Sequence, residues 1–181
     1  MRVAAMMLSV LLSSVSIASE GPGHRMIWDE NGMVMGENTG DRLPQGCLEI
    51  SEDRTIEVHV GQALARTNRV FGYDTNEWRV EPCSRITVKL QNHDDIRHMW
   101  MLHGLPHYLY YRGMFHLEAE GKRTMQGTFI IPSGDRTYLI HCDIAQHTEK
   151  GLKGQLISGK GSQDIPNIDK SPAPPHPMLE N

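Results

Sequence analysis

The stretch Ile140 to Leu152, IHCDIAQHTEKGL, places Cys142 at the end of an apolar run and His147 five residues later. Thiolate and neutral imidazole groups both bind transition metals, and two histidines, one cysteine and a weak axial group form the trigonal copper sites of electron-transfer proteins. The spacing therefore predicts two ligands of a copper site. The alternative is that Cys142 is a buried, inert hydrophobic residue and His147 a surface loop residue.

The composition indicates one domain of ordinary size with tails. The chain has 181 residues and a formal net charge of −4, and its basic residues are spread among acidic ones. It lacks the basic run that nucleic-acid binding requires, so no nucleic-acid partner is expected. Ten histidines and eleven methionines accompany only 6% aromatic residues, and both of these enriched residue types can bind metals.

Residues 1–18 have the pattern of a secretory signal peptide. Arg2 precedes an apolar run from Val3 to Leu12, and the small residues Ser16 and Ala18 precede the expected cleavage site. The run is too short for a membrane span, so we expect cleavage near Ala18, a periplasmic protein and no stable membrane anchor. An uncleaved anchor is the alternative.

The three cysteines cannot all pair within one chain. Cysteines of exported proteins tend to pair, because the compartment outside the cytoplasm is oxidising. Only Cys142 has a histidine at ligand spacing. We therefore predict a disulfide between Cys47 and Cys83, with Cys142 as the free thiolate.

The segment 19–45 is rich in Gly, Asn, Asp and Glu and shows neither helical nor strand periodicity. This composition favours a flexible arm. The arm carries His24, a candidate ligand for cupric ion, and Met26, Met33 and Met35, which suit cuprous ion better. The alternative is a solvated tail in which these residues have no role.

The domain is expected to span 46–158 and to be all-β. Short alternating or apolar segments, separated by turn signals, predict strands at 55–60, 85–90, 96–102, 124–132, 138–142 and 152–158. No segment has a convincing helical pattern longer than a few turns, which favours a Greek-key sandwich or barrel. Residues 159–181, which end in SPAPPHPMLEN, predict a disordered, proline-rich tail.

The second histidine lies upstream, in NHDDIRHMW, where His98 follows a polar turn at the start of a predicted strand. Asn92 to His98 has the pattern N-x-x-x-x-x-H, and Cys142 to Leu152 has C-x-x-x-x-H-x-x-x-x-L. These two motifs, in this order, resemble those of the blue-copper proteins, or cupredoxins. The resemblance implies a Greek-key β-sandwich that binds one copper through His98, Cys142 and His147.

The axial position departs from the common cupredoxin pattern. Many cupredoxins have methionine where this chain has Leu152, which cannot coordinate a metal. The pattern HC-x-I-x-x-H-x-x-x-G-L of residues 141–152 is similar instead to the mononuclear site of multicopper oxidases, where leucine can occupy that place. A site without an axial donor should favour the cuprous state, unless a backbone carbonyl such as that of Arg97 substitutes. Those oxidases have a histidine where this chain has Asp143, so no trinuclear oxygen-reducing cluster is expected.

A His/Met-rich segment follows His98 directly. On an alternating strand, Met99, Met101 and His103 share one face, opposite His98. Thioether and imidazole donors together suit cuprous copper. The candidate Cu(I) ligands in this segment are Met99, Met101, His103, His107, Met114 and His116. The alternative is that the methionines fill the core and the histidines lie on the surface.

The cupredoxin ligands, this segment and the His/Met-bearing arm together resemble the CopI-type cupredoxins of bacterial copper tolerance. The resemblance implies that cuprous ion binds the segment and is oxidised by electron transfer to a type 1 copper centre, a cuprous oxidase activity. Copper ions and a redox partner protein are the implied partners. Simple electron transfer between redox partners, or a non-redox copper chaperone or sponge, are the rival functions. We expect Asn92 and Asp143 to orient the two histidine ligands; the alternative is that both only cap turns.

Overall fold

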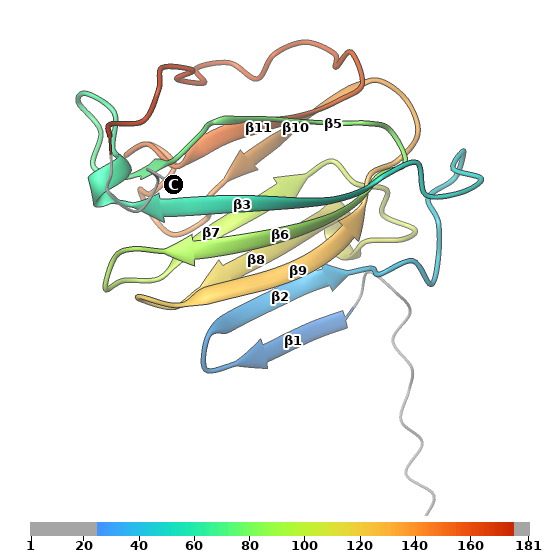
Figure 1. Ribbon diagram of the computed structural model, residues 1–181, viewed down its shortest axis with the longest axis horizontal. Coiled ribbons are helices and arrows are strands. Elements are labelled where there is room, and N and C mark those ends of the chain that lie inside the picture. Colours follow the sequence, from blue (N-terminus) through green and yellow to red (C-terminus); the bar gives the residue numbers. More distant parts are fainter. Residues whose placement is uncertain (1–24, 176–181) are drawn as a thin grey trace, which may run out of the picture.

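The protein is a sandwich of two β-sheets, described for residues 25–175 by a computed structural model (Figure 1). The larger sheet has the strand order β1 (Arg25–Asp29), β2 (Gly32–Glu37), β8 (Met114–Ala119), β7 (His98–His103), β10 (Arg136–His141), β11 (Lys153–Ser158) and β5 (Glu77–Val80). The smaller sheet has the order β4 (Gly72–Tyr73), β3 (Asp53–Gly61), β6 (Arg85–Asn92) and β9 (Thr124–Ile130). Two short 3-10 turns, η1 (Gln62–Leu64) and η2 (Tyr111–Gly113), lie in the connections. The predicted all-β sandwich is confirmed.

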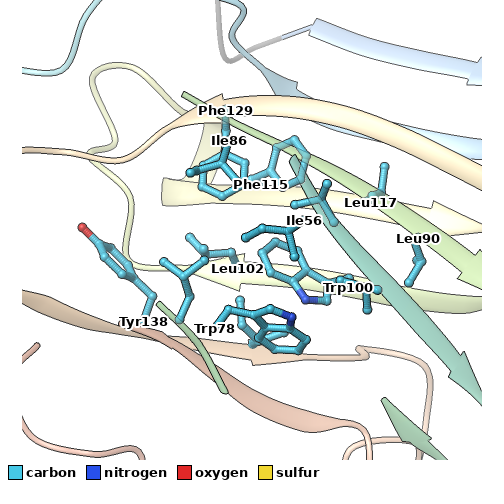
Figure 2. Close-up of a cluster of buried hydrophobic side chains, with 14 of the residues drawn as sticks. Ile56, Trp78, Ile86, Leu90, Trp100, Leu102, Phe115, Leu117, Phe129 and Tyr138 are labelled. Atoms are coloured by element: carbon cyan, nitrogen blue, oxygen red, sulfur yellow. The ribbon is translucent and has the colours of Figure 1, made fainter. Parts of the chain in front are cut away.

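The core lies between the two sheets and follows from strand alternation. In β6, every second side chain from Ile86 to Asn92 is buried. In β7 and β8, Trp100 and Phe115 point inward and are fully buried, and Figure 2 shows them in the same cluster as Ile86 and Leu90 of the facing sheet. Burial of such side chains contributes about 1.5–3 kcal/mol each, so this cluster is the main source of stability.

The prediction of a flexible arm at 19–45 was wrong for residues 25–37. These residues form the β1–β2 hairpin, and β2 pairs with β8 inside the larger sheet. Residues 32–36 of β2 are all buried, so β2 lacks the polar and apolar alternation by which a half-exposed strand is recognised. His24 and the predicted signal peptide lie outside the described residues.

The predicted disordered tail is also corrected, for residues up to Ser171. This segment has no regular secondary structure, but it is held against the domain by hydrogen bonds. Asn76 donates to the carbonyl of Asp169 at 2.8 Å, and Arg66 donates to the carbonyl of Ser171 at 3.1 Å. Composition alone gave no sign of these contacts. Residues 176–181 lie outside the described part of the chain.

Cys47 and Cys83 form the predicted disulfide, with their Cα atoms 5.6 Å apart. The bond joins the segment that leads into β3 to the turn that leads into β6, and these two strands pair in parallel. Between residues 25 and 175, no helix of the structure is long and apolar enough to cross a membrane.

Replacing both Cys47 and Cys83 with Ser should lower the free energy of unfolding by about 2–5 kcal/mol, because the bond constrains the unfolded chain across a sequence separation of 36 residues. Urea unfolding followed by tryptophan fluorescence measures the change. Reductant should destabilise the natural protein by a similar amount and leave the double variant unaffected. Equal unfolding midpoints for the two proteins would contradict the prediction.

Candidate metal centre

Three predicted ligands converge at one end of the sandwich. His98 opens β7, Cys142 directly follows β10, and His147 lies in the loop between β10 and β11. Their ligand atoms all lie within 4.8 Å of one another, and Cys142 Sγ is 3.5 Å from His147 Nδ1. All three side chains are buried. The fold therefore brings donors that are 44 and 5 residues apart in the sequence to a common point.

His98 is held with one ring nitrogen directed into this site. Its Nε2 lies 2.7 Å from Asp94 Oδ2, while its Nδ1 is buried and has no hydrogen-bond partner among the described residues. Asp94 in turn accepts the backbone N–H of Gln62. A carboxylate on one nitrogen fixes the tautomer and leaves the lone pair of the other nitrogen for a metal. Burial lowers the pKa of His98, against the opposing effect of Asp94, which favours the neutral, metal-binding form.

Cys142 is completely buried, and burial raises the pKa of its thiol to about 11. The backbone N–H groups of Ile144 and Met99 hydrogen-bond the sulfur and act in the opposite direction. The thiol therefore keeps its proton at neutral pH in the absence of a cation, and metal binding would release that proton.

Phe71 covers the two histidines. Its ring centroid lies 5.0 Å from that of His98 and 4.6 Å from that of His147. The ligand loop reaches Phe71 because residue 151 is glycine: a Cβ there would lie 2.2 Å from the Phe71 carbonyl oxygen, and its φ of +128° disfavours other residues. Burial, followed by the nearby His98 and Lys150, lowers the pKa of His147.

Leu152 is fully buried and cannot donate to a metal. Its backbone N–H donates to the His147 carbonyl at 3.0 Å, and its carbonyl accepts the Cys142 N–H at 3.1 Å. These bonds fix the spacing of the loop ligands. Two imidazoles and one thiolate, buried together beside a non-coordinating residue, fit the donor set of a type 1 copper site.

The predicted orienting residues were not the right ones. Asn92 donates to the carbonyls of Ile96, Ala119 and Glu120 and so braces the turn before His98. Asp143 is exposed, and no hydrogen bond joins it to His147 among those described. Asp94 performs the role expected of Asn92. Its position in NHDDIRH, four residues before the ligand, is the sequence signal that could have identified it.

The structure places five of the six candidate Cu(I) ligands on the outer face of the larger sheet. Cross-strand register pairs Met101 with His116 and His103 with Met114, and Met99 lies on the same face. His107 instead is exposed, in the loop that precedes η2 and close to Gly113. His116 is buried, which lowers its pKa to about 4 and keeps it neutral.

Sequence reasoning overlooked His141 on the same outer face. Its Nε2 lies 2.9 Å from His103 Nε2, and the two rings stack with their centroids 4.8 Å apart. Strand alternation could have identified it, because an inward Cys142 requires the preceding residue to point outward.

Comparisons with solved structures find copper proteins, at low similarity. Auracyanin A, a blue copper protein from Chloroflexus aurantiacus, is 21% identical, with a TM-score of 0.46 over 59% of this chain and 99% of its own. Reduced auracyanin from Roseiflexus castenholzii is 23% identical, with a TM-score of 0.45 over 58% and 96%. The multicopper oxidase mgLAC is 17% identical, with a TM-score of 0.48 over 64% and 41%. No family model and no curated protein matches the chain.

Asp94→Asn should weaken copper binding by about 10–100-fold, the usual effect of losing a group that orients a metal ligand. Asp95→Asn is the matched control, because the adjacent Asp95 side chain is 90% exposed and pairs only loosely with Lys122. Competition titration against a chelator of known affinity measures both variants. Equal effects at the two positions would show that Asp94 does not orient His98.

Leu152→Met should lower the reduction potential of a copper centre at this site, because a thioether donor would stabilise the cupric form. Leu156→Met, at an equally buried core position in β11, should leave the potential unchanged. Potentiometric titration of the visible absorption band measures both variants. A potential that does not change in Leu152→Met would mean that residue 152 does not face the metal.

Proposed function

We propose that this protein is a periplasmic cupredoxin for copper tolerance that binds cuprous ion at its His/Met-rich segment and oxidises it by electron transfer to a type 1 copper centre. Each cuprous ion gives up one electron and leaves as cupric ion. A redox partner protein then takes the electron from the centre. Copper is thus both the cofactor and the substrate.

The observation that carries the proposal is the convergence of His98, Cys142 and His147, where the buried His98 Nδ1 has no hydrogen-bond partner within residues 25–175. Leaving such a nitrogen unsatisfied costs about 1–3 kcal/mol, and a metal at that point would supply the missing partner. Copper held there would supply one-electron redox chemistry. The Cys47–Cys83 disulfide supports an oxidising compartment such as the periplasm.

The protein's own groups prepare the site without the metal. Asp94 fixes the tautomer of His98, and Phe71 packs on both imidazoles, so neither ligand has to move far on binding. The N–H groups of Met99 and Ile144 stabilise negative charge on Cys142 Sγ. A rigid, largely water-free ligand set of this kind is what rapid one-electron exchange requires.

The function is tested by adding cuprous ion, without oxygen, to protein that holds cupric ion at the Cys142 site, and by following the visible thiolate-to-copper band. We expect the band to bleach. Bleaching should be much slower in a variant with Met99→Leu, Met101→Leu and His103→Ala, because the substrate would lose its soft ligands. The control variant carries Met125→Leu and His59→Ala, both in the smaller sheet.

The outcomes separate the rival functions. Equal bleaching rates in the natural protein and the triple variant would favour a simple electron carrier, and no bleaching in either would favour a chaperone or sponge. Cys142→Ser should remove the band, whereas the double Cys47, Cys83→Ser variant should keep it. A band that survives Cys142→Ser would refute the assignment of the centre.

A further inference from the structure

The outer face of the larger sheet carries a continuous row of soft donors. Strand register makes each residue in the row the direct partner of the next, across five neighbouring strands. Side chains of directly opposed residues on one face lie about 4.5–5.5 Å apart at Cβ. The row runs Met26, Met35, His116, Met101 and His141.

His141 is prepared as a ligand at one end of this row. Thr148 donates its hydroxyl proton to the Cys142 carbonyl at 2.7 Å, so its oxygen is the acceptor for His141 Nδ1 at 3.3 Å. The proton of His141 therefore lies on Nδ1, and the lone pair of Nε2 points at His103 Nε2, 2.9 Å away. A ring N–H donated to a neighbour is the arrangement that orients metal-binding histidines.

His116, in the middle of the row, also has a buried ring nitrogen. The His116 side chain is 91% buried, and its Nε2 lies 3.7 Å from Glu118 Oε2, which is too far for a hydrogen bond; no other described residue bonds this nitrogen. His116 is the partner of Met101 on one side, while His141 is the partner of Met101 on the other. The middle of the row thus holds a buried imidazole nitrogen beside Met101, with no hydrogen-bond partner among the described residues.

We infer that His103 Nε2, His141 Nε2 and the Met101 thioether form a second copper site, which takes a cuprous ion on the outer face of the larger sheet, with His116 and Met35 continuing the donor row. Two imidazoles and a thioether are a soft, low-coordinate set that suits cuprous copper. The inference rests on the proposed function only for the identity of the metal.

The proposed site lies directly across the sheet from the candidate metal centre at Cys142. His141 and Cys142 are consecutive, and they face opposite sides of the sheet, so one peptide unit joins a ligand of each site. The site would hold the substrate ion at the point where the covalent route to the Cys142 sulfur is shortest. His141 is not among the six candidate Cu(I) ligands that the sequence predicted.

The stacked pair His59 and His93, in the smaller sheet and the loop after it, serves as a control for the proposed site. His59 Nδ1 lies 2.8 Å from His93 Nε2, with the rings stacked at 5.1 Å. The cross-strand partner of His59 is Gln91. This pair therefore has a similar geometry but no thioether at the register position that Met101 occupies in the proposed site.

The test uses Cys142→Ser protein, titrated with cuprous ion in competition with bicinchoninate. We expect one cuprous ion to bind, and we expect His103→Ala or His141→Ala to weaken that binding by at least about tenfold, the smallest effect typical of losing even an indirect partner of a metal. Met101→Leu should weaken it as well, and His59→Ala should not. Two-dimensional NMR of the imidazole rings should show His103 and His141 shifting together.

Binding that survives both histidine changes, or that His59→Ala reduces equally, would overturn the inference. If Cys142→Ser lowers stability, the same titration is made on natural protein that already holds one copper at the Cys142 site, and loss of the second equivalent in His141→Ala is the expected result. Neither measurement depends on bleaching of the visible band. The second site can therefore be supported even if the bleaching test fails, and the bleaching test can succeed even if the second site is refuted.

Discussion

The candidate metal centre and the proposed outer site both depend on the pairing of β7 with β10. Leu102 pairs with Ile140, and Met101 pairs with His141, so the strand that begins with one ligand lies beside the strand that ends at another. Alternation then sends His98 and Cys142 to the inner side and Met101 and His141 to the outer side. A shift of one residue in this register would exchange the two faces and remove both donor sets together.

The inner site combines burial with a small number of polar contacts. Burial alone would favour the neutral thiol and neutral imidazoles, and it does raise the pKa of Cys142 and lower that of His98. The Asp94 carboxylate acts in the opposite direction and raises the pKa of His98, and two backbone N–H groups lower the pKa of Cys142. Two imidazoles and a thiol held together in this way suit a cation that accepts nitrogen and sulfur ligands.

Much of this arrangement could be predicted from the sequence, because local patterns carry it. Alternation located most strands of the domain. The spacing of Cys142 and His147, and the motif that ends at His98, predicted the three residues that the fold brings together. The β1–β2 hairpin was overlooked because β2 is buried on both faces and therefore has no period of two. Asp94 and His141 were overlooked for a different reason, since the role of each depends on a partner whose position only the folded sheet defines.

The single free thiol has a consequence for how the chain acquires its covalent structure. In an unfolded chain all three cysteines can exchange, since exchange needs only an accessible thiolate and a disulfide. Once β10 is packed, Cys142 is completely buried and its thiol is a poor nucleophile at neutral pH. Closure of the sandwich around Cys142 therefore protects the Cys47–Cys83 pairing from rearrangement, and Cys142 no longer competes in disulfide formation.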